Sequence, residues 1–306
     1  MPNEFAPIAV VLGVLAGALI PVQTAINSRL SGRLGAVLPA SLVSFAVGSL
    51  GLGLAVLFTG TSVPWAETAA TEPWWIWIGG VCGLVFLTLN IVLLPRIGAA
   101  ATVVLPLVGQ VLGGLVIDLA GGFETAVRPL TVVRGIGGVL VVLGAALVNL
   151  VGRGSAAIGH ARPHPVLWVA GILAGTLGAV QTAVNGRLAE VMGSGLASAL
   201  VSFLVGTVGL VLVNLASRQR VHEVTGVRPW MLVGGLMGAV FVLVNAVNAP
   251  ILGTSLAVSA ALLGQILMGL VLDHGGHLGI ARRPITPARV IGALLVVAGV
   301  VLVRLG

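Results

Sequence analysis

Two pairs of side-chain amides are the residues of this sequence best suited to recognise a polar solute. Gln23 lies four residues before Asn27, and Gln181 lies four residues before Asn185. In a helix this spacing places each pair on one face, one turn apart, and an amide offers both hydrogen-bond donors and acceptors. The four residues are therefore candidates for lining a cavity for a polar solute. The alternative is that they hydrogen-bond to neighbouring helices as packing contacts.

A second repeated set combines an amide with a carboxylate. Gln110 precedes Asp118 by eight residues, and Gln265 precedes Asp273 by the same number. Eight residues are a little over two helical turns, so the two side chains lie near one helix face. Both aspartates come at the end of an apolar stretch, where the helix dipole disfavours a carboxylate. We expect each to have a cationic partner, the alternative being that water solvates it at the membrane interface.

The composition indicates that these residues are positioned by membrane-spanning helices. The chain is 58% hydrophobic and 8% charged, with a mean hydropathy of +1.17, whereas about 25% of the residues of a soluble domain are charged. Apolar stretches of about 20 residues match a hydrocarbon core roughly 30 Å thick. We predict an all-α polytopic membrane protein with ten spans: residues 7–27, 37–58, 74–94, 98–119, 131–151, 166–186, 195–216, 230–250, 254–273 and 287–305.

The second half of the chain repeats the first. Residues 22–30 return as residues 180–188, and Gly109-Gln110 returns as Gly264-Gln265. Each copy holds five predicted spans, and an odd number of crossings makes the second copy enter the membrane from the opposite side. Inverted repeats are a recurrent transporter architecture, with the binding site near the midplane between them. The predicted domains are a five-helix repeat at residues 1–152, a linker at 153–165 and an inverted repeat at 166–306.

This topology suggests partners for the two aspartates. Span one ends near Arg29 on the side where span nine ends at Asp273, and span six ends near Arg187 where span four ends at Asp118. We predict that Arg29 pairs with Asp273 and Arg187 with Asp118, forming two gates between the repeats on opposite membrane faces. Arg128 and Arg283 are competing partners.

The net charge of +7 comes from fifteen arginines and no lysine. They are spread over short loops instead of clustering on one soluble face, which argues against nucleic-acid binding. Eleven fall on one side of the predicted topology and four on the other. The positive-inside rule then places both termini outside the cytoplasm.

No catalytic or cofactor site is visible in the sequence. The predicted spans hold no histidine, and their only acidic residues are the two terminal aspartates, so a nucleophile with its base or a metal site within the membrane is not expected. His160 and His164 lie in the predicted linker and lack further ligands. There is no nucleotide-binding signature. A transporter is therefore favoured over an enzyme, with a passive facilitator, a channel or a membrane assembly protein as the alternative.

The sequence resembles the YdcZ-type inner-membrane proteins of the drug/metabolite transporter superfamily, which are EamA-like. The resemblance rests on Gln23, Asn27 and Arg29-Leu30, on Ser44-Phe45 with Gly48, and on the segment from Gly109-Gln110 to Asp118. These motifs occur twice and in order, so the chain looks like two fused copies of a five-span protein.

The resemblance implies a ten-helix secondary transporter in the bacterial inner membrane that exports a small organic solute. The related small multidrug exporters carry a glutamate in their first helix, where this chain holds Gln23 and Asn27. Ten-span relatives with cytoplasmic termini imply the opposite orientation to the arginine count. The partners expected are the lipid bilayer, the solute and a coupling proton or sodium ion, with a homodimer as an option and no cofactor or metal.

Overall fold

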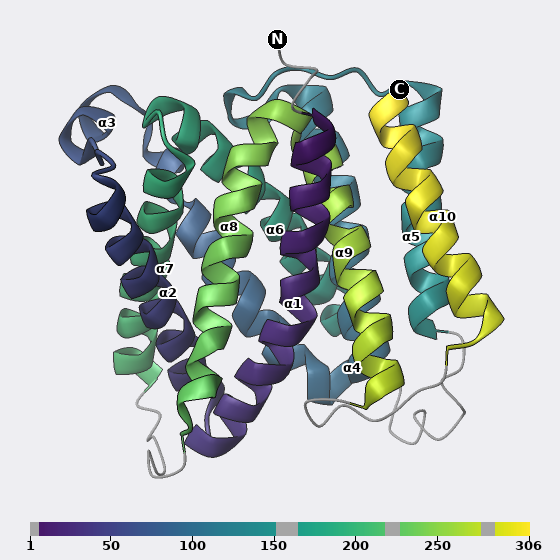
Figure 1. Cartoon of the computed structure of the whole chain (residues 1–306), viewed down its shortest axis with the longest axis horizontal. Helices are drawn as coiled ribbons and strands as arrows, with labels where there is room; N and C mark the ends of the chain where they lie inside the picture. Colours follow the sequence, from purple (N-terminus) through teal and green to yellow (C-terminus); the bar gives the residue numbers. More distant parts are fainter. Residues whose placement is uncertain (1–5, 151–164, 218–226, 277–284) are drawn as a thin grey trace.

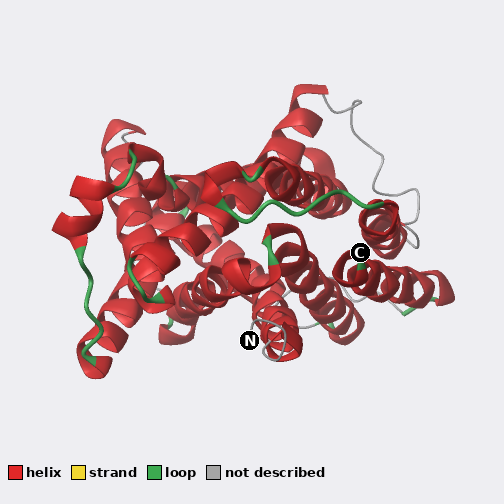
Figure 2. Cartoon of the chain, turned by 90° about the horizontal axis from the view of Figure 1, so that it is seen from above, coloured by secondary structure: helices red, strands yellow, loops and turns green. Residues whose placement is uncertain are grey.

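All regular secondary structure in the described part of the chain is helical. The computed structural model describes residues 6–150, 165–217, 227–276 and 285–306, and no strand occurs among them (Figures 1 and 2). The all-α prediction is thus confirmed over these residues. The helices are α1 (Ala6–Leu34), α2 (Val37–Thr59), α3 (Trp65–Thr71), α4 (Gly79–Ala120), α5 (Val132–Leu150), α6 (Pro165–Val191), α7 (Gly195–Ser217), α8 (Val233–Leu252), α9 (Thr254–Gly275) and α10 (Pro287–Leu305).

Within the described residues, six helical stretches are long and apolar enough to cross a membrane. They comprise α1, α2, α6, α7, residues 229–252 and residues 254–272, and four shorter apolar stretches lie at residues 79–90, 105–120, 132–148 and 287–303. Each stretch coincides with one of the ten predicted spans. Many large apolar side chains on their surfaces are exposed, including Leu57, Phe58 and Leu215. Such a surface is expected where helices face lipid.

The prediction of ten separate spanning helices is not confirmed, because spans three and four form one continuous helix. This helix, α4, has 42 residues. Its two arms nevertheless run along α6 in opposite directions. Gly79 and Gly83 face Asn185 and then Gln181, whereas Gly109 and Gly113 face Ile172 and then Ala179. The chain therefore reverses within α4. At the corresponding place in the second half, the backbone leaves the helical conformation at Gly253, whose φ is +80°. Glycine adopts this φ without steric cost, and the residue separates α8 from α9.

The helices α1 and α6 extend beyond the predicted spans, which end at residues 27 and 186. They continue to Leu34 and Val191, so Arg29 and Arg187 lie on helices. The chain stops being helical near Gly35, with a φ of +70°, and Gly193, with a φ of +64°. Apolar composition predicts where a span leaves the hydrocarbon core, but the helix continues beyond that point to a residue that terminates it, here a glycine with positive φ.

Corresponding helices of the two halves pack together at both ends of the molecule. At one end α2 lies against α7, where the Phe45 and Phe203 rings stack at 4.9 Å and the Ser49 and Thr207 hydroxyl oxygens are 2.9 Å apart (Figure 1). Each of these two contacts joins residues 158 positions apart. Equivalent residues of the two halves therefore meet face to face.

At the other end α5 lies against α10, and their glycines allow a close approach. A Cβ added to Gly137 would lie 2.8 Å from the Gly299 carbonyl oxygen, and one added to Gly144 would lie 2.5 Å from the Gly292 oxygen. Gly292 and Gly299 are the counterparts of Gly137 and Gly144 at the offset of 155 residues. The two contacts are thus reciprocal, and small residues of this kind let membrane helices pack closely.

Between these ends, α1 packs against α8 and α9, and α6 packs against both arms of α4. The start of α1 and the end of α10 lie on the same side of the molecule (Figure 1). The predicted linker, residues 153–165, lies outside the described residues except for Pro165, where α6 begins.

Candidate functional site

The amide pair on α1 packs directly against the bare backbone of α8. The Nδ2 of Asn27 donates to the Ser44 hydroxyl on α2 at 3.1 Å. A Cβ added to Gly234 would lie 2.5 Å from Asn27 Oδ1, and one added to Gly238 would lie 2.5 Å from Gln23 Nε2. The two glycines are four residues apart, like the amides that they face. The spacing of four residues thus fits the packing of α1 against α8, as well as placing both amides on one helix face.

The pair on α6 repeats this arrangement. Asn185 Nδ2 donates to the Ser202 hydroxyl on α7 at 3.1 Å. A Cβ on Gly79 would collide with Asn185 Oδ1, and one on Gly83 would lie 2.5 Å from Gln181 Nε2. The asparagines thus make packing contacts between helices, one of the two predicted roles. Gln23 and Gln181 form no hydrogen bond within the described part of the chain, so the other role, lining a cavity, remains open for them.

Two amide oxygens in this region are buried without a hydrogen-bond donor among the described residues. They are Oδ1 of Asn27 and Oδ1 of Asn185, in side chains of residues that are 1% and 2% exposed. A buried acceptor without a partner costs about 1–3 kcal/mol. Because both oxygens pack against glycine backbone, at Gly234 and Gly79, a donor could reach them only if these helices moved apart.

The other two predicted cavity residues lie beside helix crossings. Gln110 is buried on α4, and its side chain approaches Gly178, three residues before Gln181 on α6. Residues three apart lie on one helix face, so Gln110 and Gln181 lie toward the same interface. Gln265 is half-buried on α9. The preceding Gly264 allows the backbone of α9 to approach that of α1 at Val14.

Asp118 is the centre of a buried polar cluster that joins the two halves. Its Oδ1 accepts from the Thr254 N–H at 2.8 Å, and its Oδ2 accepts from the Ser255 N–H at 3.1 Å and the Ser255 hydroxyl at 2.5 Å. Arg134 Nη2 lies 2.8 Å from the same Oδ2. Asp118 is 1% exposed and Arg134 is 5% exposed.

This cluster solves the problem that the helix dipole poses for Asp118. The carboxylate lies at the C-terminal end of α4, where it is disfavoured, but it also lies at the N-terminus of α9, whose free N–H groups favour an anion. Gly253, the N-cap residue of α9, makes no side-chain cap. Asp118 therefore supplies, from the first half, the cap that α9 lacks.

The predicted pair of Arg187 with Asp118 is not formed in this structure. Arg187 contacts Glu124 at 2.8 Å and Glu72 and Glu190 at 3.8 Å. Asp118 is instead occupied by Arg134, because α5 begins beside the end of α4. Of the predicted competitors, Arg128 donates its backbone N–H to the Asp118 carbonyl oxygen at 2.8 Å, and Arg283 lies outside the described residues.

The pairing of Arg29 with Asp273 stays a prediction, because the Asp273 side chain is outside the description. Arg29 lies over the Trp230 ring, with its guanidinium carbon 5.8 Å from the ring centroid. It also makes a further contact.

Arg134 and Ser255 are the site residues that the sequence reasoning missed. Arg134 recurs as Arg289 at the offset of 155 residues, and both are buried although they lie within predicted spans. A charged residue inside a span needs a partner, so the repeat of an arginine near the start of spans five and ten was the available signal. The backbone donors of α9 carry no such signal.

The geometry suits binding and conformational change better than bond chemistry. Among the described residues, no three His, Cys, Asp or Glu side chains gather as metal ligands. The polar groups are amides, hydroxyls and ion pairs at the crossings between helices. Such groups can hold a solute and can exchange partners when helices move.

Comparison with known proteins assigns the family. Residues 8–147 and 166–302 each match the family described as "Putative inner membrane exporter, YdcZ". Inner membrane protein YdcZ of Escherichia coli (strain K12) is 28% identical over 137 residues, which is 44% of this chain and 90% of that protein. One solved crystal structure is similar over 99% of this chain and 97% of that chain, with a TM-score of 0.69 at 18% identity, which shows a shared fold. The chain belongs to the YdcZ family and is a multi-pass protein of the inner membrane.

Proposed function

We propose that the chain is a secondary transporter that exports a small organic solute across the cytoplasmic membrane by alternating access. The family is described as one of inner-membrane exporters and not of enzymes, and we propose no catalytic activity. Residues 1–152 and 166–306 would form two inverted five-helix repeats, with residues 153–165 as their linker. The coupling ion would be a proton or a sodium ion, for which Asp118 and Asp273 are the candidate carboxylates.

Reciprocal contacts support the inverted repeats. A Cβ on Gly17 of α1 would collide with the Ala261 carbonyl of α9, and one on Gly175 of α6 would collide with the Pro106 carbonyl of α4. Gly175 is the counterpart of Gly17, and Ala261 is the counterpart of Pro106. Exchanging the two halves therefore converts the first contact into the second, as an approximate two-fold axis requires.

The observation that carries the proposal is the Asp118 cluster. It ties the first half to the start of α9 in the second half through three hydrogen bonds that α9 donates to Asp118 and one that Arg134 donates to the Ser255 hydroxyl, whereas the Asp118–Arg134 ion pair lies within the first half. Separating the halves at this face must break the hydrogen bonds to α9, whereas the Asp118–Arg134 pair can stay together. We propose that the hydrogen bonds between Asp118 and the start of α9 form the closed gate of this membrane face, with Thr254 and Ser255 in the place predicted for Arg187 and with Arg134 as the counterion of Asp118 within the first half.

The repeat suggests a weaker gate on the opposite face. At the offset of 155 residues, Asp273 and Arg289 correspond to Asp118 and Arg134, whereas Ala99 and Ala100 correspond to Thr254 and Ser255. We propose Arg289, in place of Arg29, as the partner of Asp273. The alanine sequence lacks the hydroxyl donor of Ser255, and Ala99 and Ala100 lie inside the continuous helix α4 instead of at a helix start, so this gate would have fewer hydrogen bonds.

The solute would bind between the gates, against the amide faces of α1 and α6. Gln23 and Gln181 are 9% exposed and carry donors and acceptors that have no protein partner within the described residues. We propose that these glutamines, with Gln110 and Gln265, contact the solute. Asn27 and Asn185 would hold the helix crossings and present their unpaired oxygens.

Cys82 offers a test that needs no known solute. It is the only cysteine in the chain, is buried, and lies on α4 next to Gly83, which faces Gln181. Asp118→Asn should open one face and raise the rate at which a membrane-impermeant maleimide labels Cys82. The rise should appear either in right-side-out or in inside-out vesicles, and not in both.

Two variants control this experiment. Cys82→Ala should abolish labelling, and Glu190→Gln, which removes an acid from a solvated ion pair with Arg187, should leave the rate unchanged. Unchanged labelling of Asp118→Asn in both vesicle types, or an equal rise in both, would contradict the gate.

A further inference from the structure

The loop between α4 and α5 crosses the membrane face that holds the Asp118 cluster. It comprises residues 121–131, since α4 ends at Ala120 and α5 begins at Val132. Figure 1 shows this loop in teal along the side where α1 starts, and Figure 2 shows its extended part crossing that side toward the end of α10. The loop therefore connects the central helices with the end of the molecule formed by α5 and α10.

Two consecutive residues of the loop have a backbone conformation that is unfavourable for them. Phe123 has a φ of +60° and Glu124 has a φ of +58°, and they are the only residues other than glycine with a positive φ in the described part of the chain. In this region the Cβ of an L-residue lies too close to the backbone. Such a conformation persists only where the surrounding structure holds it.

Each of these two side chains has a partner on another element. The Phe123 ring meets the Trp75 ring edge-on, with the ring centroids 5.6 Å apart, and Glu124 Oε2 lies 2.8 Å from Arg187 Nη2. Arg187 lies on α6, two residues after Asn185. The ion pair therefore ties a loop of the first half to the helix of the second half that carries an amide pair.

The same loop is bonded to the Asp118 cluster a few residues further on. The Arg128 N–H donates to the Asp118 carbonyl oxygen at 2.8 Å, and Arg134 Nη1 donates to the Pro129 carbonyl oxygen at 3.0 Å. Arg128 Nη2 also donates to the Ile251 carbonyl oxygen near the end of α8 at 3.4 Å. The loop thus connects α6 physically to the place where the first half meets the junction of α8 and α9.

The counterpart loop on the opposite membrane face lacks both anchoring side chains. At the offset of 155 residues, Leu278 stands at the place of Phe123, and Gly279 stands at the place of Glu124. Leucine has no ring, and glycine has no carboxylate and adopts a positive φ without steric cost. The two anchors therefore belong to the loop of one face.

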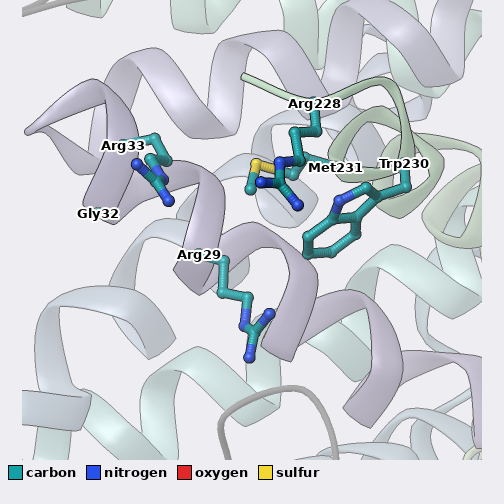
Figure 3. A pocket seen from close by; sticks show the side chains of 6 residues that line it. All are labelled: Arg29, Gly32, Arg33, Arg228, Trp230 and Met231. Carbon is teal, nitrogen blue, oxygen red and sulfur yellow. The ribbon is translucent and has the colours of Figure 1, made fainter. Parts of the chain in front are cut away.

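One of the two partners of the anchors differs as well. Met231 stands at the place of Trp75 at an offset of 156 residues, whereas the counterpart of Arg187 is again an arginine, Arg29. Met231 and Arg29 line a pocket of about 440 Å³ on the opposite face (Figure 3). The arginine is thus kept on both faces, whereas the aromatic pair and the loop carboxylate occur on one.

We propose that the α4–α5 loop is a latch that couples α6 to the Asp118 gate. The ion pair between Glu124 and Arg187 holds the strained turn, and the turn keeps the loop against the Asp118 cluster. A solute that binds Gln181 displaces α6, and with it Arg187, which lies six residues further along the same helix. Loss of the ion pair lets the turn relax and weakens the hold of the loop on the gate. This inference rests on the proposed gate and adds the element that regulates its opening.

The test follows both ends of the latch in the purified full-length chain. Hydrogen–deuterium exchange, measured by mass spectrometry, reports on the Thr254 N–H that Asp118 holds, and Cys82 labelling in oriented vesicles reports on the opening of the gate. Glu124→Gln removes the charge and leaves the loop backbone unchanged. It should raise both rates by about two- to fivefold, the range for the loss of a solvated ion pair.

Glu190→Gln is the matched control, because it makes the same acid-to-amide change beside the same arginine, at 3.8 Å, but outside the loop. It should leave both rates unchanged. The double variant Phe123→Leu with Glu124→Gly gives the loop the two residues of its counterpart. It should raise both rates without lowering the thermal unfolding temperature, because glycine relieves the unfavourable φ. A retained unfolding temperature separates release of the latch from failure to fold.

Unchanged exchange at Thr254 in Glu124→Gln, or equal changes in Glu124→Gln and Glu190→Gln, overturns the latch. If Asp118→Asn still speeds Cys82 labelling from one face in that case, the gate stands without the latch. Faster exchange at Thr254 in Glu124→Gln, with Cys82 labelling unchanged in Asp118→Asn, supports the latch and contradicts the proposed gate.

Discussion

Replacing Asp118 by asparagine should destabilise the protein far more than a change of one atom suggests. The substitution removes the negative charge of Asp118. This charge faces Arg134 Nη2 at 2.8 Å and accepts hydrogen bonds from the backbone N–H and the hydroxyl of Ser255. Arg134, which is 5% exposed, would keep its bond to the Pro129 carbonyl at 3.0 Å but would lose its counterion. Leaving one member of a buried ion pair alone costs about 3–5 kcal/mol.

The measurement is unfolding by sodium dodecyl sulfate in mixed micelles, followed by tryptophan fluorescence. Asp118→Asn should lower the free energy of unfolding by about 3–5 kcal/mol, whereas Glu190→Gln, an acid-to-amide change in a solvated pair, should change it by less than about 1 kcal/mol. The double variant Asp118→Asn with Arg134→Gln should recover part of the loss, because no unpaired charge remains buried. Equal stability of Asp118→Asn and wild type, or strictly additive losses in the double variant, would refute this reasoning.

Three further predictions follow from the packing and the polar contacts. Ser255→Ala should cost about 1.5–3 kcal/mol, the range for a hydrogen bond to a charged group, and should speed Cys82 labelling from the same face as Asp118→Asn does; no change in either quantity counts against the cluster as a gate. Gly175→Ala places a Cβ against the Pro106 carbonyl, whereas a Cβ on Gly135 meets nothing within 4 Å, so only the first should lower the unfolding temperature, by a loss of about 1–3 kcal/mol. Gln181→Leu should reduce solute-dependent stabilisation without loss of folding, while Ser49→Ala, remote from the amides, should leave that response intact; similar effects of both would remove Gln181 from the proposed binding site.

The helical elements could be predicted because their signal is compositional. Apolar stretches of span length coincide with the long helical stretches, although α1 continues to Leu34 and α3 lies outside every predicted span. The repeat related Asn27 to Asn185 before any contact was known. The continuity of α4 could not be predicted, because both halves have the same Pro and Gly at this place. Pro95 and Gly98 lie within the continuous helix α4, whereas their counterparts Pro250 and Gly253 lie where α8 ends.

The partner of Asp118 escaped prediction for a different reason. Topology shows which residues share a membrane face, but several arginines share the face of Asp118, and only packing decides among them. Arg187 satisfies the topology and yet meets Glu124, whereas Arg134 reaches Asp118 because α5 starts beside the end of α4. Backbone donors such as the Thr254 N–H belong to every residue and so leave no mark in a sequence.

Accumulation of a solute in proteoliposomes tests the central claim most directly. A solute identified by its stabilisation of the purified protein would be supplied on both sides at equal concentration, with an imposed pH or sodium gradient. Alternating access coupled to an ion predicts accumulation above the external concentration, which collapses with the gradient and is lost in Asp118→Asn. Movement that stops at equal concentrations under every gradient, and that Asp118→Asn leaves unchanged, would contradict the account and indicate a passive facilitator.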